Sequence, residues 1–159
     1  MSEGLNEGDP APAFEMPASG GRHVSLTALK GRPFVLYFYP KANTSGCTRE
    51  ACDFQEALPQ LGQAGIEVIG VSKDGMPAIE KFAARYELKF PLASDQGGHV
   101  TEDYGAWVQK SMYGRKYMGI DRSTFLIGAD GRIARIWRQV KVPNHAAEVM
   151  AAAKALKQA

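Results

Sequence analysis

Six consecutive apolar residues at 34–39 place the strongest constraint on the fold of this chain. A strand that is apolar on both sides is typical of a sheet whose two faces are both covered. The turn at 30–33, Lys-Gly-Arg-Pro, precedes the run, and Pro40 follows it. We therefore expect a buried strand over residues 34–39 in a layered α/β fold.

The rest of the chain alternates between helix and strand patterns. Residues 1–20 are rich in Gly and Pro and are expected to be an extended lead-in. The helical periodicity predicts helices at 48–63, 76–86, 100–104 and about 144–157. Further strands are expected at 24–26, 66–71 and 90–93, with a hairpin formed by 123–127 and 133–137. This order predicts a thioredoxin-like fold, in which helices flank a central mixed sheet, as a single domain over residues 1–159.

Composition and charge exclude several classes of function. The 159 residues are 45% hydrophobic and 23% charged, which is ordinary for a globular protein with its own core. A net charge of +2, spread along the chain, argues against a nucleic-acid partner. We see no signal peptide, and the apolar runs have only the length of strands, so we expect no membrane partner and a cytoplasmic location. Paired cysteines there are more often redox-active than structural.

The chain has two cysteines, Cys47 and Cys52, and both lie where the first long helix should begin. The polar loop before Cys47 offers Thr44 or Ser45 as the residue whose side-chain oxygen caps the helix. Free backbone N–H groups and the positive end of the helix dipole would then lie near the Cys47 sulfur. Such surroundings favour the thiolate, which is the nucleophilic form of cysteine.

The spacing of these cysteines separates a redox switch from a structural disulfide. In an intact helix, residues 47 and 52 have Cα atoms roughly 8–9 Å apart, whereas a disulfide needs roughly 7 Å or less. Pairing would therefore require the first helical turns to unwind. The alternative is that both are ordinary buried cysteines, which pack as small apolar side chains.

Two motifs resemble the active-site signatures of the peroxiredoxins. The first is Pro40-x-x-x-Thr44-x-x-Cys47, and the five-residue step to Cys52 resembles the Q-type subfamily. The second is the segment 112–127, which is similar to the subfamily's segment that carries the active-site arginine, here Arg122. The resemblance extends over most of the chain, with Ser45 as a departure because the subfamily usually has proline there.

The resemblance implies a role for each matching residue. Cys47 would attack a peroxide and become a sulfenic acid, and Arg122 would stabilise the thiolate and the leaving oxygen. Thr44 would hold the peroxide, with help from the backbone N–H groups of Gly46 and Cys47. Pro40 would shape and dry the pocket. Cys52 would resolve the sulfenic acid as an intrachain disulfide.

The same resemblance implies the substrates and partners. The substrates would be hydrogen peroxide and organic hydroperoxides, and the reductant would be thioredoxin. The enzyme would be a monomer. No cofactor is implied. The histidines are scattered and the cysteine spacing is not that of a zinc site, so we expect no metal.

Simpler interpretations apply to some of these residues. Thr44 alone would be only a helix cap, and Arg122 alone only a surface charge. Trp107, Tyr113 and Tyr117 could line an apolar approach to the pocket, although aromatic residues at such positions are more often core. Arg115 and Lys116 are expected to form a solvated loop face.

Two other functions use the same cysteines. A thioredoxin-like disulfide oxidoreductase would need the closer Cys-x-x-Cys spacing. A non-enzymatic redox sensor or relay would pass its disulfide to a partner protein. Rapid multiple turnover with peroxide and thioredoxin would favour the enzyme.

Overall fold

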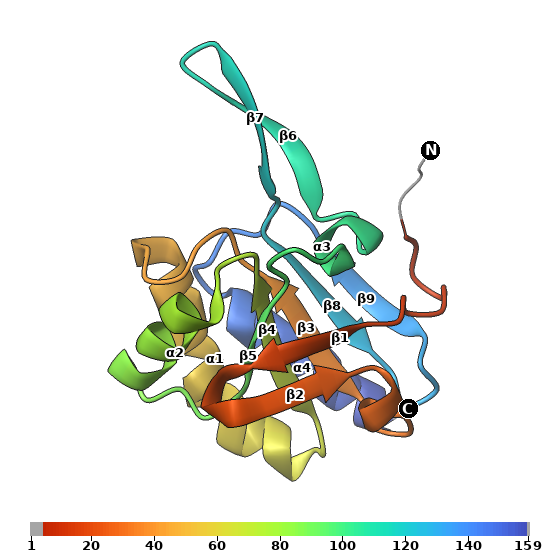
Figure 1. Ribbon diagram of the computed structural model, residues 1–159. Helices are drawn as coiled ribbons and strands as arrows, with labels where there is room; N and C mark the ends of the chain where they lie inside the picture. Colours follow the sequence, from red (N-terminus) through yellow and green to blue (C-terminus); the bar gives the residue numbers. More distant parts are fainter. Residues whose placement is uncertain (1–4, 159) are drawn as a thin grey trace.

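The computed structural model describes residues 5–158, and its centre is a seven-stranded mixed sheet with the order β2-β1-β5-β4-β3-β8-β9 (Figure 1). A separate two-stranded sheet pairs β6 with β7. The strands are β1 Glu15–Ala18, β2 Arg22–Ser25, β3 Phe34–Phe38, β4 Glu67–Ser72, β5 Leu92–Ser94, β6 Trp107–Met112, β7 Arg115–Ile120, β8 Ser123–Ile127 and β9 Ile133–Trp137.

The middle of the sheet confirms the predicted buried strand, which ends one residue early, at Phe38. All five residues of β3 are buried. It runs parallel to β4 on one side and antiparallel to β8 on the other. Because β4 and β5 are also parallel, the loops that follow β3, β4 and β5 leave from the same edge of the sheet.

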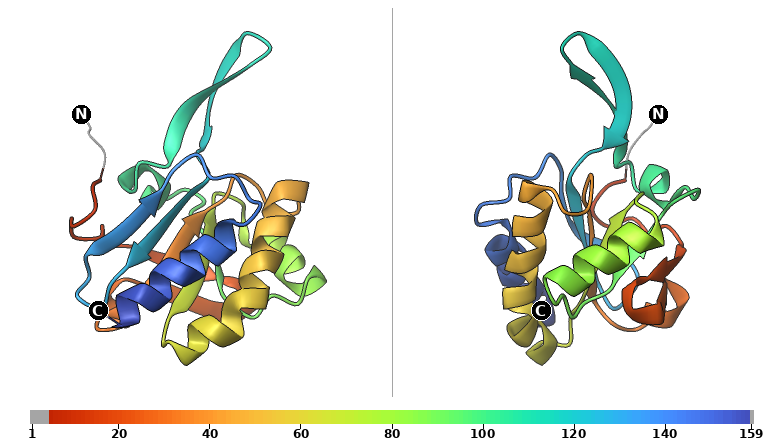
Figure 2. Two further views of the ribbon diagram at one scale, coloured as in Figure 1. Left: turned by 180° about the vertical axis from the view of Figure 1, so that it is seen from behind. Right: turned by 60° about the vertical axis from the view of Figure 1, so that its left-hand side comes forward.

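The two faces of the sheet carry two separate apolar cores. Alternate residues of β3 enter each core, since successive side chains of a strand point to opposite faces. On one face, Val35 and Tyr37 pack beneath the three longer helices, α1 Ser45–Gln63, α2 Met76–Arg85 and α4 His145–Gln158. On the other, Leu36 and Phe38 pack beneath the N-terminal segment and the short helix α3 Val100–Asp103. Figure 2 shows α1 and α4 lying side by side.

Several predicted elements are confirmed, and their boundaries move by a few residues. β8 and β9 match the predicted hairpin at both ends. Helix α1 starts at Ser45, before the predicted residue 48, because the polar loop residues complete its first turn. The lead-in prediction for residues 1–20 is wrong in part, because it contains β1. Pro17 is tolerated there since it pairs with β2 alone, through His23.

The largest departure from the predictions is the hairpin of β6 and β7, which projects from the body (Figure 1). Tyr113 and Gly114 form its turn with φ values of 53° and 79°, the two positive values of a tight hairpin turn. Arg115 and Lys116 therefore lie on β7 and not in a loop. Tyr113 is 98% exposed, so it neither lines a pocket nor joins the core.

Within residues 5–158, no helix has both the length and the apolar character that crossing a membrane requires.

Candidate active site

The candidate site lies where β3 passes into α1. Cys47 is the third residue of α1, and its side chain is buried on the face that packs against the sheet. The first amide of this helix to find a helical partner is that of Thr48, which donates to the Thr44 carbonyl over 2.8 Å. The amides of the first turn, including Gly46 and Cys47, precede it and have no carbonyl one turn back within the helix. The sulfur therefore sits at the positive end of the helix, as the sequence predicted.

Arg122 reaches the same sulfur from the loop between β7 and β8. Its Nη2 donates to the Cys47 Sγ over 3.3 Å, and its Nη1 donates to the Glu50 Oε1 over 2.6 Å. Gly46 permits this approach, because a β-carbon there would lie 3.3 Å from Nη2. One guanidinium thus joins two residues of α1 that are 75 and 72 positions away in the sequence. The structure brings Cys47 and Arg122 together, as the motifs predicted.

Glu50 is the site residue that the sequence reasoning missed. Only 1% of it is exposed, and its Oε2 has no hydrogen-bond partner among residues 5–158. Burial raises the pKa of the Glu50 carboxyl to about 7, although Arg122 opposes the shift. Burial also works against the charge of Arg122, but Glu50 and Cys47 outweigh it and raise the pKa of the guanidinium. The sequence feature that could have identified Glu50 is its position, a carboxylate on the apolar stripe of α1, one turn after Cys47.

Thr44 and Pro40 are exposed residues of the loop that leads from β3 into α1. Thr44 is the residue at the cap position of α1, but its hydroxyl makes no capping bond. It donates to the Lys41 carbonyl over 2.9 Å, so the expectation that this side chain, or that of Ser45, caps the helix is wrong. Pro40 is exposed at the start of the loop. The sequence therefore predicted the place of Thr44 but not its bond.

Asp74 fixes the loop that carries Thr44, and the sequence reasoning did not identify it. The Ala42 amide donates to Asp74 Oδ2 over 2.7 Å, and the Ser72 hydroxyl donates to the same oxygen over 2.9 Å. Asp74 follows β4, the parallel neighbour of β3, so the two loops leave the sheet at one edge. A carboxylate that accepts a backbone N–H is a strong local anchor.

Cys52 lies one and a half turns further along α1, half-buried, and both cysteines are free thiols. Burial and then the charges of Asp53 and Glu56 raise the pKa of the Cys52 thiol. Both cysteines lie inside the continuous helix, so the separation of about 8–9 Å between their Cα atoms applies. A bond between them therefore requires α1 to unwind.

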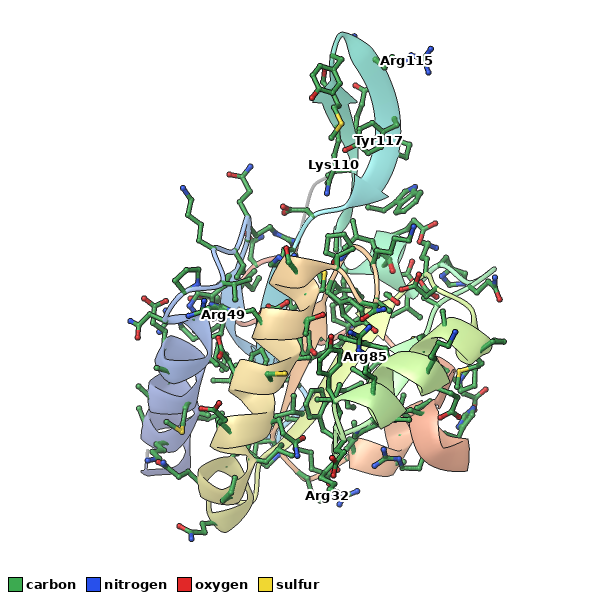
Figure 3. All side chains as sticks on the ribbon, turned by 90° about the vertical axis from the view of Figure 1, so that its left-hand side faces the viewer. Arg32, Arg49, Arg85, Lys110, Arg115 and Tyr117 are labelled. Carbon is green, nitrogen blue, oxygen red and sulfur yellow. The ribbon has the colours of Figure 1, made fainter. Side chains whose placement is uncertain are left out.

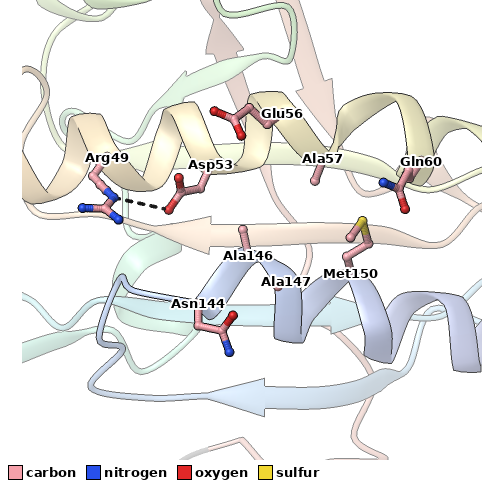
Figure 4. Close-up of a pocket in the computed structure, with 9 residues that line it drawn as sticks. All are labelled: Arg49, Asp53, Glu56, Ala57, Gln60, Asn144, Ala146, Ala147 and Met150. Atoms are coloured by element: carbon pink, nitrogen blue, oxygen red, sulfur yellow. Dashed lines mark ion pairs between the residues drawn. The ribbon is translucent and has the colours of Figure 1, made fainter.

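A groove between α1 and α4 flanks the face of α1 that carries Asp53 and Glu56 (Figure 4). An ion pair of 4.0 Å joins Arg49 to Asp53 at one end. Figure 3 shows Arg49 on the side of α1 that is turned toward α4. The groove lining does not include Cys47 or Arg122, so this hollow is separate from the place where the arginine meets the sulfur.

His145 is a buried residue at the start of α4 that contacts α1 through Phe54. Its Nε2 shares a 2.8 Å hydrogen bond with the Thr124 hydroxyl, and Phe54 and Trp137 contact its ring edge-to-face. Burial, followed by the charge of Arg122, lowers the pKa of His145 to about 4. The sequence placed this residue at the helix start and gave no indication of its contacts with α1.

A thioredoxin-like fold with a cysteine at a helix start, and an arginine from a distant loop hydrogen-bonded to its sulfur, is the arrangement expected of a thiol peroxidase. The chain belongs to the AhpC/TSA family, whose model matches residues 7–136.

Its relatives include Bcp and Q-type peroxiredoxins. A protein of Coxiella burnetii named putative peroxiredoxin Bcp is 48% identical over 146 residues, 92% of this chain and 97% of that protein. The structure of PrxQ from Xylella fastidiosa superposes with a TM-score of 0.91 at 39% identity, covering 97% of this chain and 98% of the other. The structure of a bacterioferritin comigratory protein of Xanthomonas campestris, described for its alkyl peroxide reduction activity, superposes with a TM-score of 0.87 at 40% identity. The match covers 91% of this chain and 92% of the other.

This membership settles the class of reaction. Peroxiredoxins are peroxidases, and the Bcp and Q-type members are atypical two-cysteine enzymes. The chain is therefore a thiol-dependent peroxidase that takes a peroxide as substrate and a thiol as reductant.

Proposed function

We propose that Cys47 is the cysteine that attacks the peroxide and that Cys52 resolves the product. The Cys47 thiolate attacks one peroxide oxygen, the O–O bond breaks, and sulfur is oxidised to a sulfenic acid. The other oxygen leaves as an alkoxide or hydroxide and takes a proton. The 3.3 Å bond from Arg122 to the sulfur carries this proposal, because the same donor can stabilise the charge that moves onto the leaving oxygen.

The second half of the cycle uses Cys52. Its sulfur attacks the sulfenic acid of Cys47, water leaves, and an intrachain disulfide forms. A dithiol reductant then gives two electrons and two protons by thiol–disulfide exchange, and becomes a disulfide itself. We propose thioredoxin as that reductant, because the melted start of α1 would present the disulfide to a protein.

The proposal extends to the other predicted site residues. The Gly46 and Cys47 amides and the Thr44 hydroxyl would hold the peroxide oxygens, and Pro40 would border the pocket. Both hydrogen peroxide and organic hydroperoxides would serve as substrates; the alkyl peroxide activity of the Xanthomonas relative supports the second class. A single domain, a monomeric state and a cytoplasmic location remain predictions.

Two cysteine variants test the assignment of roles. Cys47→Ser should abolish peroxide reduction with thioredoxin or dithiothreitol, because the attacking sulfur is gone. Cys52→Ser should consume about one equivalent of peroxide and retain a sulfenic acid that dimedone labels. Mass spectrometry of the labelled protein identifies the residue. Full turnover by Cys47→Ser would refute the assignment.

A further inference from the structure

The projecting hairpin, residues 107–120, has the composition of a binding surface, and we name it the arm. Four large apolar side chains at its turn and on the neighbouring strand residues are exposed: Met112 by 56%, Tyr113 by 98%, Tyr117 by 44% and Met118 by 48%. Tyr and Met are enriched at protein–protein interfaces, as is Arg, which the arm supplies at Arg115. Four exposed large apolar residues on one short hairpin are therefore unlike the scattered single ones of an ordinary surface.

The charge of the arm is entirely positive. Lys110, Arg115 and Lys116 are its charged residues, and the stretch 107–120 contains no Asp or Glu. In the described part of the chain, no ion pair or hydrogen bond involves any of these three side chains. Gly119 leaves room for the Lys110 stem beside Tyr117, because a β-carbon at Gly119 would lie 3.3 Å from the Lys110 Cδ. Figure 3 shows Lys110, Tyr117 and Arg115 along the arm. The complementary partner is acidic.

The arm is joined directly to the active site. β7 ends at Ile120, two residues before Arg122, whose guanidinium bonds to the Cys47 sulfur. From Ile120 to Arg115 the strand extends about 17 Å, at about 3.4 Å per residue. Hydrogen peroxide or a small alkyl hydroperoxide at Cys47 cannot span that distance. A protein of about 100 residues, with a radius of gyration of about 13 Å, can touch both the arm and the disulfide at once.

The positive charge of the arm also indicates whether its partner is a second copy of this chain or a different protein. Two arms facing each other would bring six positive charges together with no acidic residue of either arm between them. Like charges across an interface disfavour the complex. The activity of this enzyme already requires a thiol reductant, and a protein dithiol with an acidic, partly apolar face matches the arm in both size and charge.

We propose that the arm is the docking site for an acidic dithiol protein that reduces the Cys47–Cys52 disulfide. This inference rests on the proposed function, since the disulfide must form before the partner can reduce it. Docked on the arm, the partner's thiolate attacks the disulfide and forms a mixed disulfide, and its second thiol releases the enzyme with both cysteines reduced. The arm supplies affinity and electrostatic steering, and it takes no part in the attack on peroxide.

The test compares a protein reductant with a small one. The double variant Arg115→Glu with Lys116→Glu and the single variant Tyr113→Ser change exposed arm residues only. With thioredoxin, thioredoxin reductase and NADPH, we expect kcat/KM for thioredoxin to fall about tenfold or more in the double variant. Turnover with dithiothreitol should stay within about twofold of the parent, since that reagent needs no docking. The parent's kcat/KM for thioredoxin should decrease with added salt, and the double variant's should depend on salt less.

A matched control has the same net charge as the double variant. Lys30 and Lys89 are exposed and precede the parallel strands β3 and β5, at the edge of the sheet opposite to the active-site loop. The variant Lys30→Glu with Lys89→Glu should therefore keep the parent's kcat/KM with thioredoxin. An equal loss in this control and in the arm variant would refute docking at the arm.

Several other results would contradict docking of the reductant at the arm. An unchanged kcat/KM in the arm variants, or an equal loss with dithiothreitol, would overturn the inference. So would a parent that dithiothreitol reduces but neither thioredoxin nor glutaredoxin can. Arm-dependent dimerisation in sedimentation, or arm-dependent binding to phosphatidylglycerol vesicles, with unchanged thioredoxin kinetics, would assign the arm to a second copy or to a lipid surface. A parent without peroxide turnover in dithiothreitol would instead contradict the proposed function.

Discussion

At the scale of residues, the chemistry depends on one guanidinium that two side chains of α1 share. Arg122 donates to the Cys47 sulfur through Nη2 and to Glu50 through Nη1. The Glu50 bond therefore orients the arginine toward the sulfur. Glu50 acts through Arg122, so it is a positioning residue.

Substitutions of Arg122 and Glu50 should distinguish the electrostatic effect of the guanidinium on the sulfur from the positioning of that guanidinium by Glu50. Arg122→Met should slow the reaction of reduced enzyme with peroxide by about 10²–10³-fold, because the sulfur and the leaving oxygen lose their donor. Glu50→Gln keeps an acceptor for Nη1 and should lose much less. Stopped-flow measurement of peroxide consumption by the reduced protein gives both rates. A loss in Glu50→Gln as large as that in Arg122→Met would show that the carboxylate does more than orient the arginine.

Two buried groups should give the protein opposite dependences of stability on pH. The pKa of Glu50 is raised from 4.5 to about 7, so the folded state binds the extra proton between these values and stability falls as pH rises. The pKa of His145 is lowered from 6.5 to about 4, so the unfolded state binds the extra proton and stability rises with pH across that window. Each effect amounts to about 3 kcal/mol, so they should largely cancel.

Single variants of Glu50 and His145 should therefore each reveal the pH dependence of stability that the other residue causes. In Glu50→Gln, the free energy of unfolding should increase by about 3 kcal/mol between pH 4 and 6.5, because the His145 effect is no longer opposed. In His145→Asn, it should decrease between pH 4.5 and 7. Urea unfolding at several pH values measures both. Variants that keep the parent's pH profile would contradict the roles given to these two residues.

Sequence reasoning at this scale found the residues that carry a motif and missed those that only the fold brings together. Cys47 and Arg122 were predicted to meet because their segments resemble known signatures. Glu50 was missed because a carboxylate on an apolar stripe looks like an interruption of that stripe until Arg122 is placed beside it. The Thr44 hydroxyl was expected to cap α1, but the Lys41 carbonyl competes for it.

At the scale of elements, helix α1 must unwind for the Cys47–Cys52 disulfide to form, and it also contains the residues that limit how far the unwinding extends. Phe54 is fully buried and stacks on Tyr37, with ring centroids 4.8 Å apart, so unwinding beyond it would expose a large apolar side chain. Pro59 has no N–H, so the Gln55 carbonyl loses its usual helical partner. Phe54 lies two residues beyond Cys52 and Pro59 seven residues beyond it, so we expect unwinding to end at the turn that contains Phe54.

Amide hydrogen exchange tests where α1 unwinds. If residues 44–53 lose helical structure, the amides that bond to their carbonyls, those of residues 48–57, should lose protection in the disulfide form. Protection should persist beyond residue 59 and in strand β3. Comparison of the reduced and disulfide forms by mass spectrometry measures this. Equal protection of residues 48–57 in both forms, with the disulfide confirmed by mass, would show that the helix does not melt.

Elements with a strong pattern were predicted well, and the arm was not, for a physical reason. β8 and β9 are short, mostly apolar runs with a clear turn between them, and they contribute residues to the cores, so both of their ends could be predicted. The arm has no buried face along most of its length, so its sequence carries no apolar alternation to detect. Its remaining signal was Tyr113-Gly114, a turn dipeptide that requires two positive φ values.

At the scale of the whole molecule, the sheet separates the redox helix from the opposite core. The three longer helices pack on one face, and the N-terminal segment and α3 pack on the other. Local unwinding of α1 therefore disturbs one core and leaves the other, with β3 between them, as a fixed support for the active-site loop. The arm stands outside both cores and has its strongest contacts within itself.

This arrangement predicts that most of the arm can be removed without loss of fold. In the pairing of β6 with β7, Gln109 lies opposite Met118, so replacing residues 110–117 by Asn-Gly leaves a two-residue hairpin and keeps the base of the arm next to Arg122. Because the removed residues are mostly exposed, Tm should change by no more than about 4 °C, the equivalent of about 1 kcal/mol. Thermal unfolding by circular dichroism and peroxide turnover with dithiothreitol measure the outcome, and turnover should match the parent. A large fall in Tm would show that the arm stabilises the body. Lost turnover with an unchanged Tm would show that the arm helps to hold Arg122 at the sulfur.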